Sequence, residues 1–354
     1  MKVDFLVIGQ GIAGSWLTYF LHLAGASFRI IDKSEYWNAS AIASGIINPI
    51  TGRRFVKTWL ADELVSFADE HYSAIEKVCD AKFYSKEKIF KALHSNQDLN
   101  EWSAKAKTGY YQPFLASDEL YYMDESKFNL PFGCFHIDNA ARIDSHKFLS
   151  SWRSYLELKE FLISEEFSEC DLSFKNNAVQ WKGIQASKAI FCQGYRASKN
   201  SLFDFLPFAI TKGECLHVHA ADLGLRNILS SKISVVPLGD DLYYIGATSE
   251  LNDSTLHPTS KMYNRLIQDL NTLVKVPYEV KGHYVGIRPT VKDRRPFLGQ
   301  HPQFKNLYIF NGMGTKGYSL APYFANKLLL HLTEGKPIDR EVDIGRYQEK
   351  YENA

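Results

Sequence analysis

The chain has 354 residues, of which 45% are hydrophobic, and its 41 Lys and Arg nearly balance its 40 Asp and Glu. This length and composition fit one large domain or two interleaved domains with a substantial core, and they exclude a disordered chain. The formal net charge of +1 provides no overall attraction to nucleic acid or to an anionic membrane.

Five cysteines lie far apart in the sequence, and no two of them form a CxxC pair. An odd, dispersed set argues against a disulfide framework and against a structural zinc site. Reduced, mostly buried thiols are typical of a cytoplasmic protein. No signal peptide precedes the first predicted strand, and no segment is long and apolar enough to cross a bilayer. We therefore expect a cytoplasmic protein without a metal ion or a membrane span.

The first predicted elements are a strand, a helix and a second strand. Residues 3–8 are mostly apolar and β-favouring, residues 15–24 carry apolar side chains at helical spacing, and residues 28–31 again predict a strand. The segment 9–14 between the first strand and the helix reads GQGIAG, and the second strand ends at Asp32. This order of strand, glycine turn, helix, strand and acid is the dinucleotide-binding unit of Rossmann-like folds.

Each glycine of this segment has a specific role in the predicted unit. Gly9 allows the tight turn, Gly11 lets backbone N–H groups approach a pyrophosphate, and Gly14 permits close packing of the helix on the strand. Asp32 can accept hydrogen bonds from an adenosine ribose. Because every contextual element is present, an accidental glycine-rich turn is disfavoured.

The segments downstream of Asp32 alternate between helical and extended patterns. Helical patterns predict helices over residues 58–78, 97–107, 145–159, 259–273 and 319–333. Short apolar or alternating runs predict strands over residues 83–93, 161–164, 170–174, 177–181, 184–192, 213–219, 232–238, 242–248, 277–288 and 306–310. The segment 108–137 is rich in aromatic residues and turns, and we expect it to contribute core or pocket wall.

Five further segments share their order with the motifs of a known family. They are NASAIASGIINP at 38–49, KGE at 212–214, YIGAT at 244–248, GIRPTVKDRRPFLG at 286–299 and NGMGTKGYSLAP at 311–322. Together with the N-terminal glycine turn, they resemble the FAD-dependent D-amino acid oxidase and glycine oxidase superfamily. In that family the first of these segments passes beside the flavin ring, and the last forms a flavin-binding turn.

The resemblance implies the fold class and a division into two domains. It implies an α/β protein in which a Rossmann-like FAD-binding domain of glutathione-reductase type is interleaved with an α+β substrate domain built on a mainly antiparallel sheet. We expect the FAD-binding domain to comprise residues 1–80, 138–205 and 286–354. The substrate domain then comprises residues 81–137 and 206–285.

A flavin also explains the second glycine turn near the C-terminus. Backbone N–H groups and the helix dipole at such a turn stabilise the negative charge that a flavin gains near N1 and C2=O on reduction. Sarcosine oxidases tether their flavin through a cysteine near the arginine segment, and residues 280–300 contain none, so we expect noncovalent FAD. The residues expected to bind it are Gly9, Gly11, Ile12, Ala13, Gly14, Asp32, Lys33, Ala39, Ser40, Ser44, Gly45, Ile46, Phe167, Gly194, Gly312, Met313, Gly314, Thr315, Lys316, Gly317 and Tyr318.

Arg288 is the predicted catalytic residue. An arginine at this place could simply pair with Asp293, as most surface arginines pair with acids. In the family, however, the arginine of the GIRP-like segment binds the substrate carboxylate through a two-pronged, charge-assisted hydrogen bond. That contact orients the Cα–H bond toward flavin N5 for hydride transfer.

Three other positions bear on the substrate. Asn48 stands where D-amino acid oxidases carry a polar residue near the substrate, and we expect it to bind substrate. Lys316 is also expected to contact substrate or to stabilise a reduced flavin anion, with a solvated lysine as the alternative. Glycine oxidases help to bind the carboxylate with a tyrosine, and Ser234 occupies that position here.

The leading functional hypothesis is an FAD-dependent amine or amino acid oxidase or dehydrogenase. It would oxidise the C–N bond of an amino acid or a carboxylate-bearing secondary amine, with a small molecule as its substrate. The alternative is a tRNA-modifying oxidoreductase that removes a carboxymethyl group from an aminomethyluridine at the wobble position, with Arg53, Arg54 and Lys57 contacting RNA. The near-zero charge and the lack of a methyltransferase domain count against tRNA as a partner. A non-catalytic flavin-binding protein is the third hypothesis. The sequence leaves the exact substrate, the electron acceptor and the oligomeric state open.

Overall fold

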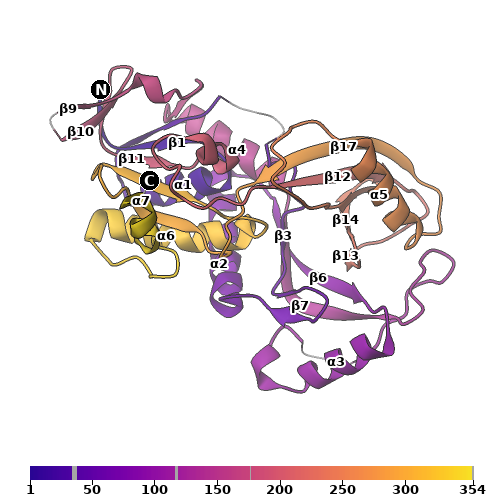
Figure 1. The fold of residues 1–354 in the computed structure, drawn as a ribbon. Coiled ribbons are helices and arrows are strands. Elements are labelled where there is room, and N and C mark those ends of the chain that lie inside the picture. The colour runs from indigo at the N-terminus through magenta and orange to yellow at the C-terminus, as the bar shows by residue number, and fades with distance from the viewer. Residues whose placement is uncertain (34–37, 116–118, 176, 353–354) are drawn as a thin grey trace.

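The computed structural model describes residues 1–33, 38–115, 119–175 and 177–352, which form two large sheets flanked by helices. Figure 1 shows the two sheets in separate halves of the molecule, with both chain termini in the same half. The predicted α/β class is confirmed, because one sheet is largely parallel with crossover helices and the other is largely antiparallel.

The first sheet contains the N-terminal dinucleotide-binding unit. Its strands follow the order β18-β19-β11-β1-β2-β8, with β10 pairing with β11 and β9 pairing with β10. The strands are β1 (Lys2–Ile8), β2 (Phe28–Ile31), β8 (Leu162–Ile163), β9 (Leu172–Lys175), β10 (Ala178–Trp181), β11 (Ile184–Phe191), β18 (Phe297–Gln300) and β19 (Leu307–Asn311). From β19 to β8 the pairing is parallel, so the carboxyl ends of these strands meet at one edge, where open α/β sheets bind ligands.

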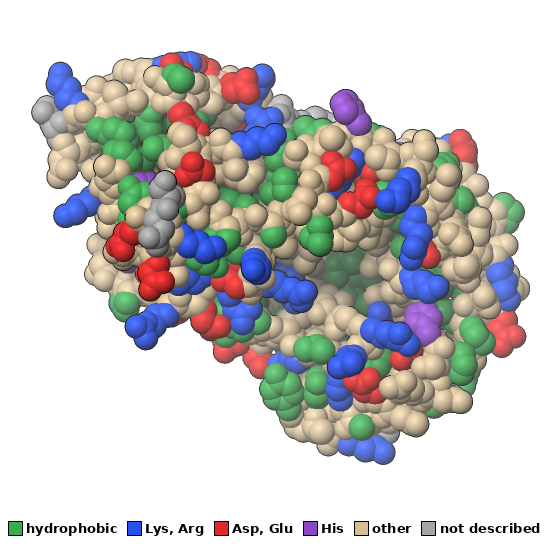
Figure 2. Space-filling model, in the orientation of Figure 1, with side chains coloured by type: hydrophobic (Ala, Val, Ile, Leu, Met, Phe, Trp, Pro, Cys, Tyr) green, Lys and Arg blue, Asp and Glu red, His purple; other side chains and the backbone are tan. Residues whose placement is uncertain are grey.

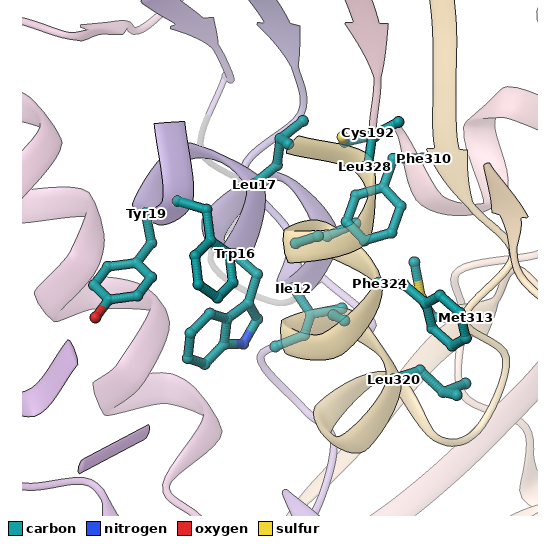
Figure 3. Close-up of a cluster of buried hydrophobic side chains, with 14 of the residues drawn as sticks. Ile12, Trp16, Leu17, Tyr19, Cys192, Phe310, Met313, Leu320, Phe324 and Leu328 are labelled. Carbon is teal, nitrogen blue, oxygen red and sulfur yellow. The ribbon is translucent and has the colours of Figure 1, made fainter. Parts of the chain in front are cut away.

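Four helices share a core with one face of this sheet. They are α1 (Ile12–Leu23), α2 (Ala61–Cys79), α4 (Ser145–Leu158) and α6 (Gly317–Glu334). Figure 3 shows Trp16 and Leu17 of α1 in one buried cluster with Phe324 and Leu328 of α6. This packing joins the two ends of the chain and brings their glycine turns together. The other face is covered by η3 (Gly194–Lys199), η4 (Ile344–Tyr347) and α7 (Gln348–Glu352).

The second sheet lies in the other half of the molecule (Figure 1). Its order is β16-β12-β15-β14-β13-β6-β7-β3, and β17 pairs with the other edge of β12. The strands are β3 (Ile46–Ile47), β6 (Tyr84–Ala92), β7 (Cys134–Ile143), β12 (Thr211–His219), β13 (Ile228–Ser230), β14 (Ser234–Gly239), β15 (Leu242–Gly246), β16 (Glu250–Leu251) and β17 (Glu279–Arg288). The remaining short elements are β4 (Ile50–Thr51), β5 (Val56–Lys57), η1 (Gly109–Tyr111) and η2 (Glu169–Asp171).

Two helices cover this second sheet. Helix α5 (Ser260–Asn271) buries Leu266 and Leu270 in the core on one face. On the other face, α3 (Asn96–Ala106) stacks Trp102 on Phe135 of β7, with ring centroids 4.6 Å apart. The sheet is thus covered on both sides, and its open end points toward the first sheet.

Sequence patterns do not predict a few of the strands, and one expected domain boundary differs from the extent of the second sheet. Strand β7 lies partly in the aromatic-rich segment, where its polar residues hide any alternation, and it pairs with β6 up to Ile143. Strand β3 has only two residues and pairs with β7. We therefore propose that the second domain also includes residues 46–47 and 138–143. Strands β13 and β18 are likewise too short to be recognised from a pattern.

Candidate active site

A cleft opens at the carboxyl ends of the parallel strands of the first sheet. It spans about 1280 Å³ of space, including the part open to solvent. Its wall comes from the ends of β1, β2 and β11 and from residues near 38–40, 165–167, 286–289 and 311–317. Segments from both ends and from the middle of the chain therefore meet in one place.

The glycines of the first turn place no side chain at the N-terminus of α1, where the hydroxyl of Ser40 accepts from the backbone N of Ile12 at 3.1 Å. Gly9 has φ of +100°, and a Cβ on it would lie 2.7 Å from the carbonyl oxygen of Cys192. A Cβ on Gly14 would lie 1.8 Å from the carbonyl oxygen of Gly9. Gly11 caps α1 with its backbone alone, so the first N–H groups of the helix face the cleft. Such a terminus suits a pyrophosphate.

Donors from Gln10 and Arg153 hold the carboxylate of Asp32 in the cleft wall. Its Oδ2 accepts from the backbone N of Gln10 at 2.8 Å, and its Oδ1 accepts from Nη1 of Arg153 at 3.0 Å. Arg153 is partly buried on α4 and also donates to Ser164 Oγ at 3.1 Å. The arginine thereby fixes the carboxylate that is expected to meet the ribose. The sequence gives no sign of it, because 121 residues separate the pair.

The C-terminal glycine turn faces the first one across the cleft. Met313, Gly314 and Gly317 line the cleft, and Gly314 has φ of +56°. A Cβ on Gly317, the first residue of α6, would lie 3.1 Å from Cγ2 of Ile12 at the start of α1. The starts of α1 and α6 are therefore neighbours, so one ligand can contact both glycine turns.

Lys316 precedes α6 but lies outside the cleft lining. Its side chain is largely buried, and this burial, with the nearby charges of Arg294 and Arg295, lowers the pKa of its amine to about 8. Its role toward a flavin or a substrate stays a prediction.

Arg288 ends β17 and lines the cleft. Its guanidinium lies over Gly213 of β12, where a Cβ would come within 2.2 Å of Nη2. Nη1 donates to the carbonyl oxygen of Thr248 at 3.2 Å. Asp293 does not pair with it; that carboxylate accepts from Arg346 Nε at 3.0 Å and from the Tyr347 hydroxyl at 2.6 Å. Among the described residues no acid forms an ion pair with Arg288, so the guanidinium donors other than the one bound to Thr248 remain available to a ligand.

The other predicted site residues divide into two groups. Besides those already placed, the cleft lining includes Ala13, Lys33, Ala39, Ser40, Phe167 and Gly194. Outside the lining are Ser44, Gly45, Ile46, Asn48, Gly312, Thr315 and Tyr318. Tyr318 supports the wall from behind, since its hydroxyl donates to the carbonyl oxygen of Ser40 at 2.8 Å. Asn48 instead caps its own turn by accepting from the backbone N of Ile50 at 2.9 Å.

Leu256 lines the cleft and was not predicted. Its loop is anchored by Lys212, a lysine with no exposed side-chain surface. The Lys212 amine donates to Thr255 Oγ1 and to the carbonyl oxygen of His257, both at 2.8 Å. Lys212 and Gly213 both belong to the KGE segment. The lysine of this motif supports the cleft wall, and its glycine makes room for the guanidinium of Arg288.

The described part of the chain holds no group of His, Cys, Asp and Glu suited to a metal ion. Burial raises the pKa of the thiols of Cys79, Cys134 and Cys215 to about 12, which keeps them protonated. None of the described helices has the length and apolar character to cross a membrane.

Comparison with known proteins identifies the family. The DAO family model, described as FAD dependent oxidoreductase, matches residues 4–329, so the chain belongs to this family and is an FAD-dependent enzyme. Uncharacterized oxidoreductase YurR of Bacillus subtilis (strain 168) is 23% identical over 97% of this chain and 98% of its own length. The tRNA 5-methylaminomethyl-2-thiouridine biosynthesis bifunctional protein MnmC of Leptospira interrogans is 23% identical over 96% of this chain, which spans 59% of that protein. The crystal structure of iminodiacetate oxidase (IdaA) from Chelativorans sp. BNC1 shares the fold, with a TM-score of 0.77 at 21% identity over 97% of this chain and 98% of that one.

The cleft fits FAD, the cofactor of this family. The bare N-terminus of α1 and the hydroxyl of Ser40 beside it would hold the pyrophosphate, and Asp32 would hold the ribose. The turn at Met313 and Gly314 would receive the polar edge of the flavin, close to Arg288. The backbone leaves no room for side chains at Gly9 and Gly14, which agrees with close approach of a ligand to this turn.

Proposed function

We propose that this enzyme oxidises the C–N bond of an amino acid or of a secondary amine that carries a carboxylate. The observation that supports the proposal is the guanidinium of Arg288, which lies in the cleft and makes no ion pair with any acid of the described residues. Its parallel N–H groups match the two oxygens of a carboxylate. The structural neighbour from Chelativorans is an oxidase of iminodiacetate, a secondary amine flanked by two carboxylates, and this agrees with the proposal.

The residues around Arg288 bind and orient the substrate. Gly213 gives the guanidinium its place, and the carbonyl oxygen of Thr248 fixes its rotation. A carboxylate paired with Arg288 has its neighbouring carbon held at a set distance from the C-terminal glycine turn. Bound FAD supplies the acceptor for the hydride that leaves this carbon, and the resulting imine is hydrolysed by water. No basic side chain is required when the amine enters in its neutral form.

Substitution of Arg288 tests the proposal. Arg288→Ala leaves the carboxylate without a partner in a partly desolvated site, which costs about 2–5 kcal/mol, or a loss of ~30-fold to several-thousand-fold in kcat/KM. Arg288→Lys restores only part of the loss, since a point charge cannot reproduce the planar fork. Anaerobic bleaching of the flavin by glycine, sarcosine, iminodiacetate and D-amino acids measures the reaction without assuming an electron acceptor.

The control for this test is an exposed arginine away from the cleft. Arg340→Ala, at an exposed position, removes the same side chain without touching the site. We expect it to bleach at the wild-type rate, and we expect all variants to retain FAD. Wild-type rates in both Arg288 variants would contradict the proposal.

A basic surface favours a second candidate, removal of a carboxymethyl group from a modified uridine of tRNA. Burial together with the charges of Lys91, Lys232 and Arg53 lowers the pKa of His94 against the opposing charge of Asp98, so these three cations lie around one histidine. Figure 2 shows Lys and Arg side chains around a hollow in this face of the molecule. The relative from Leptospira interrogans is a tRNA modification protein. A carboxymethylaminomethyl group carries the same carboxylate and secondary amine, so Arg288 would serve this substrate equally.

The two candidates differ in their dependence on the basic surface. The double variant Arg53→Ala/Lys91→Ala should weaken turnover of a tRNA that carries carboxymethylaminomethyluridine and leave turnover of small amines unchanged. Turnover of such a tRNA should also fall steeply as salt rises, because phosphate contacts release counterions. Bleaching by small amines alone would exclude the tRNA candidate.

A further inference from the structure

One apolar side chain from the second half of the molecule lines the cleft that fits FAD. Leu256 lies in the loop 252–259, between β16 and α5, and it is 44% exposed. Its neighbours Thr255 and His257 are exposed as well. Single exposed leucines are common on protein surfaces, so exposure alone carries no meaning. The position becomes informative because buried charges hold the loop that carries Leu256.

A buried lysine holds the middle of this loop. Lys212 on β12 has no exposed side-chain surface, and its amine lies 3.1 Å from Oδ2 of Asp253. The amine also donates to Thr255 Oγ1 and to the carbonyl oxygen of His257, both at 2.8 Å. Removing a lysine from water is costly unless several oxygens surround its amine, as they do here. Because the two contacts at 2.8 Å flank Leu256 in the sequence, the lysine fixes the backbone from which Leu256 reaches the cleft.

Both ends of the loop are fixed as well. At its start, the backbone N of Asn252 donates to the carbonyl oxygen of Ile210 at 3.0 Å. At its end, the buried carboxylate of Glu214 accepts from the backbone N and from the hydroxyl of Thr259, at 2.9 and 3.0 Å. The loop is thus held at both ends and in its middle, so Leu256 has a fixed place in the cleft wall.

The same cleft wall combines Leu256 with segments of the first half that are expected to hold FAD. These are the glycine turn at the start of α1, Asp32, and the C-terminal turn at Met313 and Gly314. A cofactor that occupies the cleft therefore covers exposed apolar surface of Leu256, and burial of such surface is favourable. A side chain on a loop that is already fixed loses little conformational entropy when a ligand covers it. Leu256 is thus suited to increase the affinity for the cofactor.

We propose that Leu256 is a cofactor-binding residue that packs on FAD from the second half of the molecule and slows its release. Lys212 is then a positioning residue, which acts through the loop 252–259 and not by touching the cofactor. The inference concerns the cofactor alone and is independent of the substrate proposed for Arg288. It makes FAD a link between the two halves, because each half contributes contacts to it.

The test measures FAD release instead of turnover. The FAD-loaded enzyme is diluted into buffer, and the flavin fluorescence of the filtrate over time gives the rate of release. Leu256→Ser should speed release about 5-fold to 20-fold, because apolar surface is no longer buried against the cofactor. Leu256→Met keeps an apolar side chain of similar volume and should release FAD at nearly the wild-type rate. Leu251→Ser is the matched control, since Leu251 on β16 is 73% exposed and lies outside the cleft lining.

A second variant tests the anchor of the loop. Thr255→Val removes a hydroxyl that accepts from Lys212, at an exposed position. It should speed FAD release in the wild-type background and have no further effect in Leu256→Ser, because it acts through Leu256. The apoprotein of Leu256→Ser should unfold at the wild-type Tm, since an exposed leucine contributes little to the core.

The outcomes separate a contact with the cofactor from other roles of Leu256. Fast release from Leu256→Ser with nearly wild-type release from Leu256→Met would support the inference. Wild-type release from Leu256→Ser, or an equal acceleration in Leu251→Ser, would overturn it. A changed KM for the amine with unchanged FAD release would also overturn it, because Leu256 would then face the substrate.

Discussion

Gly213→Ala should disable Arg288 without removing it. The added Cβ would lie 2.2 Å from Nη2 and 2.5 Å from Cζ of the guanidinium, whereas ordinary contact begins at 3.4 Å. The guanidinium must therefore move by about 1.2 Å, and a misplacement of ~1 Å at a binding group can lower the rate about 100-fold. That loss corresponds to about 2.7 kcal/mol of transition-state stabilisation. The fold should survive, because the displaced atoms are the far end of a flexible side chain.

The assay combines kcat/KM for the best amine with FAD content and Tm. Gly109→Ala provides the control, since a Cβ at Gly109 meets nothing within 4 Å. A double-mutant cycle supplies the sharper test: in an Arg288→Ala background, Gly213→Ala should have no further effect on kcat/KM, because its only action is through the arginine. A folded, FAD-loaded Gly213→Ala enzyme with wild-type kcat/KM would refute the reasoning.

Three further predictions follow from the cofactor half of the cleft. Acid precipitation should release a yellow supernatant with the mass of FAD, and flavin that stays with the precipitate would contradict noncovalent binding. Arg153→Met should raise the Kd of FAD about 2-fold to 10-fold in titrations of apoprotein, because Asp32 loses the hydrogen bond from Arg153; an unchanged Kd would show that the pair is irrelevant to the ribose. The pKa of Lys316 is lowered to about 8 in the folded protein. Between pH 8 and the pKa of this lysine in the unfolded chain, the unfolded state therefore binds more protons than the folded state. The free energy of unfolding rises with pH over that range. Lys316→Met should therefore gain stability relative to the wild type at pH 7 and lose that gain near pH 10 in urea unfolding of apoprotein, and a pH-independent difference would argue against a buried amine.

Local patterns were sufficient for the glycine turns, whereas Arg288 was singled out by the family resemblance of its segment. The motif GQGIAG lies between a strand and a helix in sequence as in space, and Asp32 directly ends the next strand. The fold class and the FAD dependence predicted from these motifs are confirmed. The roles of the individual residues remain predictions, although most of those assigned to the cofactor do line one cleft.

The residues that the sequence did not indicate depend on contacts between distant segments. Arg153 meets Asp32 only because α4 packs beside α1, and its own helix has no unusual pattern. The position of Gly213 beneath Arg288 likewise depends on the register of β12 with β17, and a shift of one residue would turn one of the two to the other face.

The arrangement of the two halves makes cofactor binding and substrate binding separable. Most of the segments expected to hold FAD belong to the first sheet and to the helices at both chain ends, whereas Gly213 lies on the second sheet. Strand β17 connects the two halves, since it pairs with β12 and ends at the cleft with Arg288. A change at Gly213 or Arg288 should therefore alter kcat/KM while the FAD content stays constant. Loss of FAD in the Arg288 or Gly213 variants would instead indicate damage to the fold, so FAD content decides whether each of these tests reports on the carboxylate.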